Sequence, residues 1–251
     1  MPTVFLAHGA PPALDDATWM AQWREWGRAL GTPRAILMIS AHWIDTPITL
    51  GATRTVPLVY DFYGFPERYY RVTYPAPSAP ELASRVRELL GEPVRESERG
   101  LDHGAFVPLM GMYPDAGVPV LQISLPSEDP ARLVELGRAL APLRDEGTLI
   151  VGSGFITHNL RAATFGAQPS LLPSWATDLD AWTADAVRRH DLDALIDYRA
   201  RAPGVQMSLP THEHFVPLLV AAGAARQGER ATFPIEGWVF GPFTKRSVQW
   251  G

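Results

Sequence analysis

His212, Glu213 and His214 place two imidazoles and a carboxylate within three consecutive residues, just ahead of the apolar run that begins at Leu218. Such groups lose hydration when they are buried, so a folded chain must give them partners. One interpretation is that one histidine caps a helix while the other faces water. A divalent metal ion is the simplest partner that satisfies all three groups, and the segment therefore predicts a metal site.

The chain contains seven histidines, and most have surroundings unlike those of a solvated side chain. His190, within the charged run 188–191, is the one expected on a solvated helix face. The other six lie beside apolar residues, glycine or proline, mostly where a strand is expected to end: His8, His42, His103, His158, His212 and His214. Ligands of open α/β sheets collect at the carboxyl ends of the strands, so histidines from different strands can converge there.

Continuous apolar runs lead directly into two of these histidines. Val4–Ala7 runs into His8, and Ala35–Ser40 runs into the segment that contains His42. Runs without polar alternation are typical of strands buried on both faces of a parallel sheet. Further strands are expected at 118–125, 148–155, 231–235 and 237–240, and segments with helical spacing separate most of them. The pattern predicts an α/β fold: a single domain over residues 1–251, with a mixed, largely parallel central sheet flanked by helices and a metal site at the C-terminal strand ends.

The expected strand at 148–155 contains Gly152 and Gly154, which allow another backbone or a ligand to approach closely. Ser153 lies between these glycines, but the sequence is not the G-x-S-x-G elbow that presents a nucleophile. We therefore do not expect Ser153 to act as a catalytic serine. The strand leads to His158 and Asn159, whose amide is expected to hold the loop.

Seven aromatic residues occur between Tyr60 and Tyr74 without helical or strand spacing. One interpretation is a long loop pinned by its own side chains. The other is a wall or lid of a pocket for a flat, apolar ligand. In the second interpretation the substrate-binding residues are Asp61, Phe62, Tyr63 and Phe65.

The pattern H-x-x-F-V-P-L occurs twice, starting at His103 and at His212. If both copies enter a helix in the same way, these two histidines have equivalent supporting roles. His214, which has Ala105 as its counterpart, is then the additional histidine that faces the metal.

The composition excludes several classes of function. A net charge of -5 without a basic stripe argues against a nucleic-acid partner. The absence of cysteine leaves histidine, aspartate and glutamate as metal ligands. No signal peptide or membrane-spanning run stands out, which predicts a soluble cytoplasmic protein without a membrane partner. A monomer or small homo-oligomer is expected.

Six motifs in order resemble the class III extradiol ring-cleavage dioxygenases, and the 4,5-DOPA dioxygenase-type branch in particular. They span most of the chain: His8-Gly9-x-Pro11, Ser40-Ala41-His42-Trp43, Tyr60-Asp61-Phe62-x-Gly64-Phe65-Pro66, Asp102-His103-Gly104, Gly154-x-x-x-His158-Asn159-Leu160 and Glu213-His214-Phe215-x-Pro217-Leu218. The resemblance implies a metal-dependent enzyme that uses O2 to open a catechol ring, DOPA-like or related, beside its two hydroxyls.

The resemblance also implies roles for single residues. His8, His42 and His214 are similar to the metal ligands of the family, and His158 to its acid/base histidine, with a fourth metal ligand as the alternative role. His103 is a second catalytic candidate, and Asp61 falls in a motif near the pocket. An all-histidine site departs from the two-histidine, one-carboxylate set typical of non-haem Fe(II). We expect Fe(II) for activity, with Zn(II) as the alternative in the same site.

Two rival functions fit the same histidines. The first is a zinc-dependent hydrolase in which the metal activates water and His158 or Glu213 serves as the base. The second is a non-catalytic scaffold whose pocket serves binding. Metal analysis separates the three hypotheses, because they predict iron, tightly bound zinc, or no metal.

Overall fold

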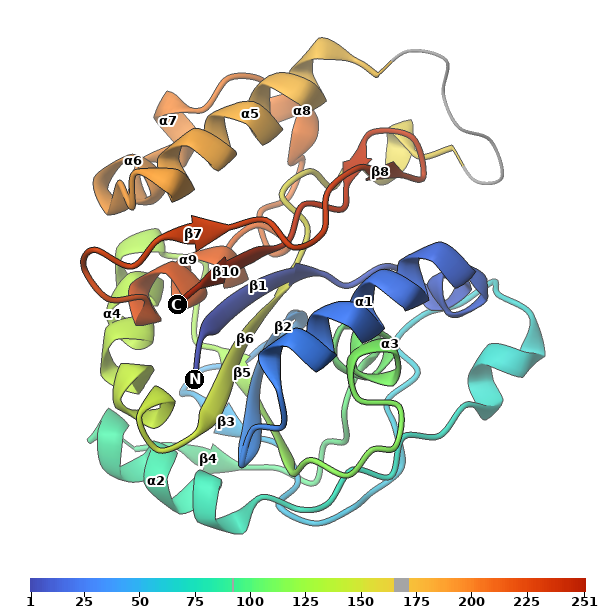
Figure 1. The fold of residues 1–251 in the computed structure, drawn as a ribbon, viewed down its shortest axis with the longest axis vertical. Coiled ribbons are helices and arrows are strands. Elements are labelled where there is room, and N and C mark those ends of the chain that lie inside the picture. The colour runs from blue at the N-terminus through green and yellow to red at the C-terminus, as the bar shows by residue number, and fades with distance from the viewer. Residues whose placement is uncertain (92, 165–171) are drawn as a thin grey trace.

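The computed structural model of the chain describes residues 1–91, 93–164 and 172–251. The strands of its central sheet are β1 (Thr3–Ala7), β2 (Ala35–Ile44), β3 (Thr49–Leu50), β4 (Arg95–Glu96), β5 (Val120–Leu125), β6 (Thr148–Gly154), β7 (Ala231–Thr232) and β10 (Val248–Trp250). They lie in the order β4-β3-β5-β2-β6-β1-β10-β7 (Figure 1). A separate hairpin pairs β8 (Trp238–Val239) with β9 (Phe243–Thr244).

The α-helices are α1 (Ala17–Leu30), α2 (Pro80–Leu90), α3 (His103–Met112), α4 (Pro130–Leu140), α5 (Ser174–Arg188), α6 (Leu192–Ile196), α7 (Tyr198–Arg201), α8 (Val205–Ser208) and α9 (Pro217–Ala224). Helices α5 to α8 form the upper part of the molecule in Figure 1. Some helix starts follow from side-chain caps: Asp16 accepts a hydrogen bond from the Trp19 amide at α1, and Asp129 accepts one from the Arg132 amide at α4.

The centre of the sheet is parallel and its edges are mixed. Strands β5, β2, β6 and β1 run parallel to one another, whereas β10 pairs antiparallel with both β1 and β7. This arrangement confirms the predicted α/β fold with a mixed, largely parallel sheet. It also brings the carboxyl ends of β1, β2 and β6, each of which leads to a histidine, to one edge of the sheet.

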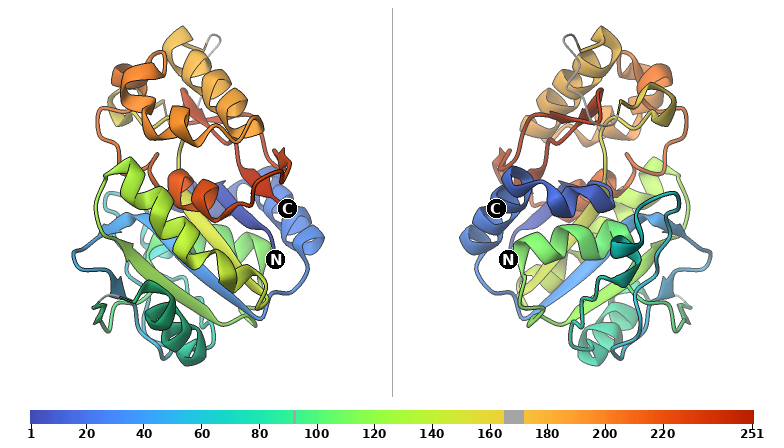
Figure 2. Two further views of the ribbon diagram at one scale, coloured as in Figure 1. Left: turned by 90° about the vertical axis from the view of Figure 1, so that its left-hand side faces the viewer. Right: turned by 90° about the vertical axis from the view of Figure 1, so that its right-hand side faces the viewer.

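Helices cover both faces of the sheet, which explains why its central strands are mostly apolar (Figure 2). Along β2, Ile36 and Met38 pack into one cluster with α1 and α3. Leu37 and Ile39 pack into the other cluster with α2, α4 and α9. Because successive strand residues point to opposite faces, continuous burial requires the unbroken apolar run seen in the sequence.

The C-terminal region differs from the prediction. The expected strands at 231–235 and 237–240 are reduced to the two-residue strands β7 and β8. The sheet also gains a strand that was not expected, β10, which inserts between β1 and β7. Its sequence, Val248-Gln249-Trp250, is too short to carry a periodic signal.

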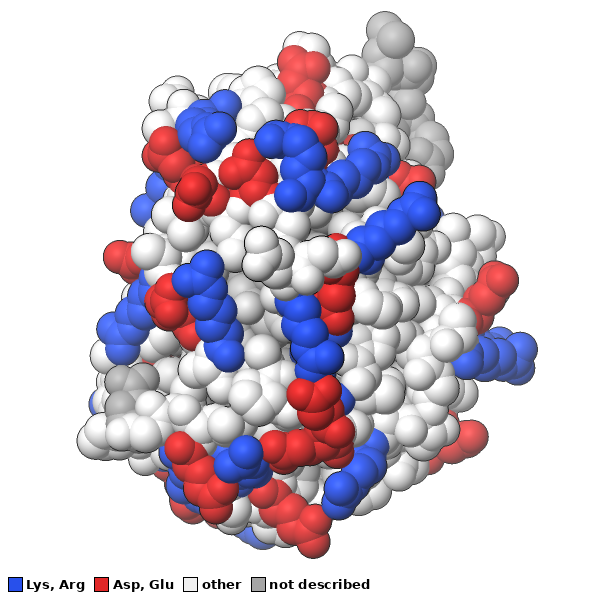
Figure 3. Space-filling view, turned by 60° about the vertical axis from the view of Figure 1, so that its left-hand side comes forward, with Lys and Arg blue, Asp and Glu red and all other residues white. Residues whose placement is uncertain are grey.

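The surface seen in Figure 3 carries basic and acidic side chains interspersed. None of the helices in the described ranges is both long and apolar enough to cross a lipid bilayer.

Candidate metal centre

Five histidines gather at the carboxyl edge of the sheet. His8 follows β1, His42 lies near the end of β2, and His103 opens α3, whereas His158 and His214 lie in the loops after β6 and before α9. The distances between ring centroids are 4.8 Å for His8–His42, 4.9 Å for His42–His214 and 5.3 Å for His8–His214. His103 lies 4.0 Å from His42, and His158 lies 3.4 Å from His214.

Three of these rings form a set suited to one metal ion. Ligand nitrogens of His8, His42 and His214 lie within 4.8 Å of one another, and the Nε2 atoms of His8 and His42 are 3.1 Å apart. Nitrogens bonded at roughly 2.0–2.1 Å to one tetrahedral ion lie roughly 3.3–3.4 Å apart. The spacing of the three rings therefore fits a bound cation. Burying these ring nitrogens without a cation would be unfavourable, because they lose their hydration.

Oxygen atoms lie behind each of the three rings. Nδ1 of His214 is 2.9 Å from Oε1 of Glu213, and Nδ1 of His42 is 3.5 Å from Oδ2 of Asp61. Nδ1 of His8 is 3.0 Å from the hydroxyl of Ser153. Oxygen partners on one ring nitrogen leave the other nitrogen available as a metal ligand.

Burial keeps these imidazoles neutral. Loss of hydration, followed by repulsion from neighbouring imidazoles, holds the pKa values of His8 and His214 well below their usual range. The same causes lower the pKa of His42 to about 3, although Asp61 opposes the shift. A metal ion binds the neutral form of imidazole, so these low pKa values favour binding of a cation over protonation.

The position of His214 depends on the glycines of β6. The Phe155 amide donates a hydrogen bond of 2.8 Å to the His214 carbonyl. A Cβ atom on Gly154 would lie 2.0 Å from that carbonyl oxygen, and one on Gly152 would lie 2.3 Å from the Pro217 carbonyl oxygen. This confirms the prediction that these glycines permit the close approach of another backbone.

His158 lies beside the three-ring set, against two phenylalanine rings. Its ring stacks on His214 with an interplanar angle of 9° and also contacts Phe155 and Phe243. Burial lowers the pKa of His158 to about 4, partly offset by the charge of Glu213. Asn159 holds the loop as expected, because its amide donates to the Met207 carbonyl. His158 can also join Glu213 and His214 as a ligand group, which leaves both of its predicted roles open on geometry.

His103 and the aromatic segment form the opposite side of the cluster. Nδ1 of His103 is 2.7 Å from Oδ1 of Asp61. The ring centroids of His103 and Phe62 are 5.8 Å apart, in an edge-to-face contact. Burial opposes ionisation of Asp61, but bonds to His103 hold the pKa of this carboxyl below its usual value. Phe62 in turn packs on Phe65, so the segment is pinned by its own side chains beside His103, and its role as the wall of a substrate pocket stays a prediction.

Three residues singled out in the sequence have surroundings that differ from those expected. Tyr63 is 91% exposed and does not pack with Phe62 and Phe65, so its role in substrate binding stays a prediction. His212 contacts Tyr198 rather than the cluster, while its supposed equivalent, His103, lies inside it. The repeated pattern fails because α3 begins at His103, whereas α9 begins only at Pro217. His190 is also not plainly solvated, since its Nε2 lies 3.1 Å from the Ala222 carbonyl oxygen.

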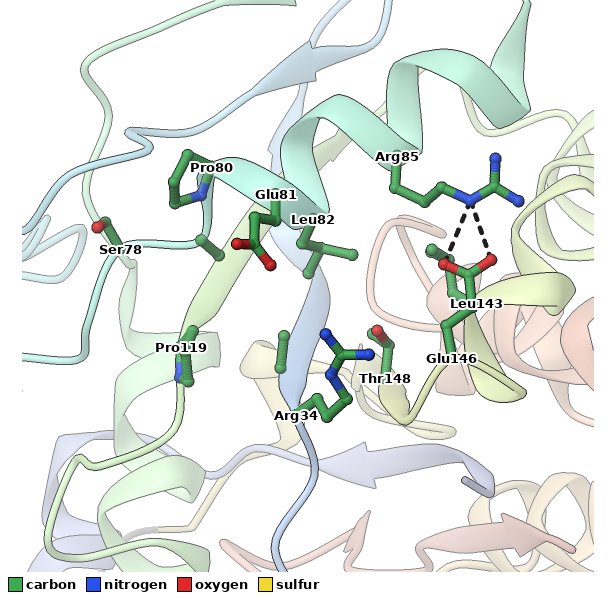
Figure 4. A pocket seen from close by; sticks show the side chains of 12 residues that line it. Arg34, Ser78, Pro80, Glu81, Leu82, Arg85, Pro119, Leu143, Glu146 and Thr148 are labelled. Atoms are coloured by element: carbon green, nitrogen blue, oxygen red, sulfur yellow. Dashed lines mark hydrogen bonds and ion pairs between the residues drawn. The ribbon is translucent and has the colours of Figure 1, made fainter.

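A hollow of about 560 Å³ lies at the other end of the strands, near the starts of β2 and β6 and against α2. Figure 4 shows its lining, in which Arg85 pairs with Glu146 and no histidine takes part. The Arg85 Nε atom is 2.9 Å from Oε1 of Glu146. This hollow is therefore separate from the histidine cluster and contains none of the proposed metal ligands.

The chain matches known proteins over nearly its whole length. Residues 2–248 match the family model described as the catalytic LigB subunit of aromatic ring-opening dioxygenase. A 4,5-DOPA dioxygenase extradiol of Escherichia coli K12 is 40% identical, with 100% of this chain and 95% of that protein aligned. One from Beta vulgaris is also 40% identical, over 94% of this chain and 91% of that protein.

A solved structure agrees with these relatives. The crystal structure of an uncharacterized protein from Escherichia coli K12 has a TM-score of 0.86 and 37% sequence identity, and it covers 100% of both chains. The buried histidine set and the family match together support a metal cofactor, an aromatic substrate and O2. The chain belongs to the catalytic LigB family of aromatic ring-opening dioxygenases, and it is an extradiol dioxygenase that cleaves a catechol-type ring.

Proposed function

We propose that this dioxygenase acts on DOPA or a related substituted catechol and binds Fe(II) through His8, His42 and His214. The observation that carries this proposal is the 3.1 Å approach of two Nε2 atoms, from His8 and His42, in a buried and neutral cluster. Two lone pairs held this close repel each other unless a cation or a proton lies between them. The names of the relatives from Escherichia coli and Beta vulgaris support the choice of substrate.

The chemistry of the reaction favours iron over zinc as the active metal. When bound, Fe(II) supplies coordination positions for the catechol oxygens and for O2, together with the redox capacity that Zn(II) lacks. Divalent affinities generally increase from Fe(II) to Zn(II), so the same imidazoles would retain zinc if it were available. We propose that zinc occupancy is inactive and that iron occupancy is active.

His158 is the proposed acid/base group. A pKa of about 4 makes its imidazole neutral at neutral pH, so it can accept a proton from a substrate hydroxyl. Its ring lies on His214 and also contacts Phe155 and Phe243, so aromatic side chains shield part of the imidazole from water. We propose this role for His158 in preference to that of a fourth ligand.

His103 and the aromatic wall are proposed to orient the ring. Asp61 accepts a hydrogen bond from Nδ1 of His103, so the other ring nitrogen is free to accept one from substrate. Phe62 and Phe65 present apolar surfaces beside His103 that suit the face of a catechol. His103 thus has a catalytic role, with Asp61 fixing its orientation.

The family match does not favour the zinc hydrolase or the non-catalytic scaffold. The decisive experiment is anaerobic reconstitution with Fe(II), followed by measurement of O2 uptake with DOPA and a panel of substituted catechols. We expect stoichiometric O2 consumption and a yellow ring-opened product. The zinc-loaded protein is the matched control and should be inactive. Absence of O2 uptake with iron bound in the site would reject the proposal.

A further inference from the structure

The three proposed ligands differ in the oxygen partner that lies next to the Nδ1 atom of each ring. Glu213 and Asp61, both carboxylates, lie behind His214 and His42. His8 has a neutral partner instead, the Ser153 hydroxyl at 3.0 Å, and both residues are fully buried. A hydroxyl can either donate or accept, so by itself it does not determine which nitrogen of His8 carries the proton.

A second contact of Ser153 removes this ambiguity. Its Oγ atom also forms a short hydrogen bond with the carbonyl oxygen of Gly104, in the first turn of α3. A carbonyl oxygen cannot donate, so the single hydroxyl proton of Ser153 must lie between these two oxygens. Ser153 can then only accept from His8, which must carry its proton on Nδ1 and present the lone pair of Nε2.

The surroundings hold this chain of hydrogen bonds in place. Ser153 lies on β6, in register with Leu6 of β1 on one side and with Ser40 of β2 on the other. A Cβ atom on Gly104 would lie 2.4 Å from the Ser40 hydroxyl and 3.0 Å from Cδ2 of His42. Glycine at this position therefore lets α3 approach closely enough for its carbonyl to reach Ser153.

We propose that Ser153 is a positioning residue that sets the tautomer of His8 and so prepares its Nε2 atom for the metal. The proposal rests on His8 being a ligand, as in the proposed function. It assigns Ser153 a role through a hydrogen-bond chain from Gly104 to Ser153 to His8, and not as a nucleophile.

The tautomer itself can be measured without metal. In metal-free protein labelled with ¹⁵N-histidine, long-range ¹H–¹⁵N NMR spectra distinguish an Nδ1-protonated ring from an Nε2-protonated ring. We expect His8 of the wild type to be protonated at Nδ1, and the Ser153→Ala variant to show a substantial Nε2-protonated fraction. Protonation of wild-type His8 at Nε2 would overturn the proposal directly.

Metal affinity provides the second readout, measured as the dissociation constant of Zn(II) in competition with a chelator. Ser153→Ala should weaken binding by roughly 10–100-fold, the usual effect of removing an outer partner of a ligand. Ser153→Thr, which keeps the hydroxyl, should restore most of the affinity. The matched control is Ser124→Ala, because Ser124 is another fully buried strand serine whose hydroxyl accepts one hydrogen bond and donates one. It accepts from the Thr49 backbone amide and donates to the Asp45 carbonyl, and neither residue is a proposed ligand.

The outcomes separate this proposal from the proposed function. Equal Zn(II) affinity in Ser153→Ala and Ser124→Ala, with tight binding by the wild type, would reject the role of Ser153 alone. If the wild type bound no metal, the proposed function would fail, and the NMR result would still decide the tautomer of His8.

Discussion

The two ends of the parallel strands show how differently one sheet can treat polar groups. At the carboxyl edge, imidazoles are buried against one another, and the Nε2 atoms of His8 and His42 are 3.1 Å apart. At the amino edge, Arg85 and Glu146 line a hollow of about 560 Å³ and form a partly exposed ion pair with each other. The charges that line the hollow compensate each other, whereas the histidine cluster is costly without a cation. The buried imidazoles therefore identify the functional edge of the sheet, and the volume of the hollow at the amino edge does not.

The largest effect on metal binding should come from substitution of a proposed ligand at the carboxyl edge. His214→Ala should weaken Zn(II) binding by more than about 100-fold, beyond the effect of losing an outer partner, and should abolish ring cleavage. His212→Ala is the matched control, because this ring contacts Tyr198 outside the cluster. Equal metal loss in the two variants, measured by chelator competition, would show that the ligand has been assigned to the wrong histidine.

His158→Gln tests whether the carboxyl edge separates metal binding from proton transfer. We expect near-normal iron content and a turnover that is roughly 10²–10⁴-fold lower, the usual contribution of a positioned acid/base group. Iron analysis and steady-state kinetics on the same preparation provide the measurement. Parallel loss of iron and turnover would make His158 a fourth ligand, and full activity would leave it a structural residue.

Glu213→Ala tests the support behind a ligand. Loss of the carboxylate that accepts from Nδ1 of His214 should weaken Zn(II) binding by roughly 10–100-fold. Turnover at saturating iron should change less than in His158→Gln. An unchanged Zn(II) dissociation constant would mean that Glu213 does not orient His214.

The stability of the metal-free protein should depend on pH through the same cluster. The pKa values of His42 (about 3) and His158 (about 4) lie below the usual 6.5, so the unfolded chain binds more protons than the folded one in mildly acidic solution. Stability is retained above about pH 6.5 and falls as the pH decreases toward 4. Urea unfolding at pH 7.5 and pH 5 measures this loss, and His158→Gln should reduce it. If the unfolding free energy fell by the same amount between pH 7.5 and pH 5 in wild type and variant, His158 would not contribute to the pH dependence.

The smallest effect is expected at the amino edge. Arg85→Ala removes ion pairs with Glu146 and with Glu88. The side chains of Arg85, Glu146 and Glu88 are 39%, 38% and 66% exposed, so solvent screening limits the cost of each pair to about 0.2–1 kcal/mol of unfolding free energy. Metal content and ring cleavage should not change. A marked loss of turnover with normal stability would show that the two edges are coupled and that their contrast has been overstated.

Local patterns in the sequence were sufficient to predict much of this arrangement. The apolar runs that become β1 and β2 require burial on both faces, and parallel neighbours then bring His8 and His42 to one edge. The glycines of β6 likewise indicated a close backbone approach. These inferences hold because strand periodicity and glycine sterics depend on neighbours in the sequence.

Other features depend on contacts that no local pattern encodes. His103 and His212 share a motif, but only the first lies in the cluster, because the two helices begin at different points relative to the motif. The Gly-Ser-Gly sequence was the only signal for Ser153, and it gave no indication that the hydroxyl would lie between His8 and Gly104. Tyr63 belongs to an aromatic segment by composition, yet its neighbours pack and it does not.

We expect His8, His42 and His214, brought together from separate elements, to bind one metal ion. A crystal structure of the anaerobically prepared Fe(II) protein, with data collected on both sides of the iron absorption edge, tests this expectation most directly. We predict one anomalous peak within roughly 2.0–2.3 Å of a ring nitrogen of each of the three residues, distances close to those of metal–imidazole bonds. A peak held instead by His42, Asp61 and His103, or by His158, Glu213 and His214, would contradict the account.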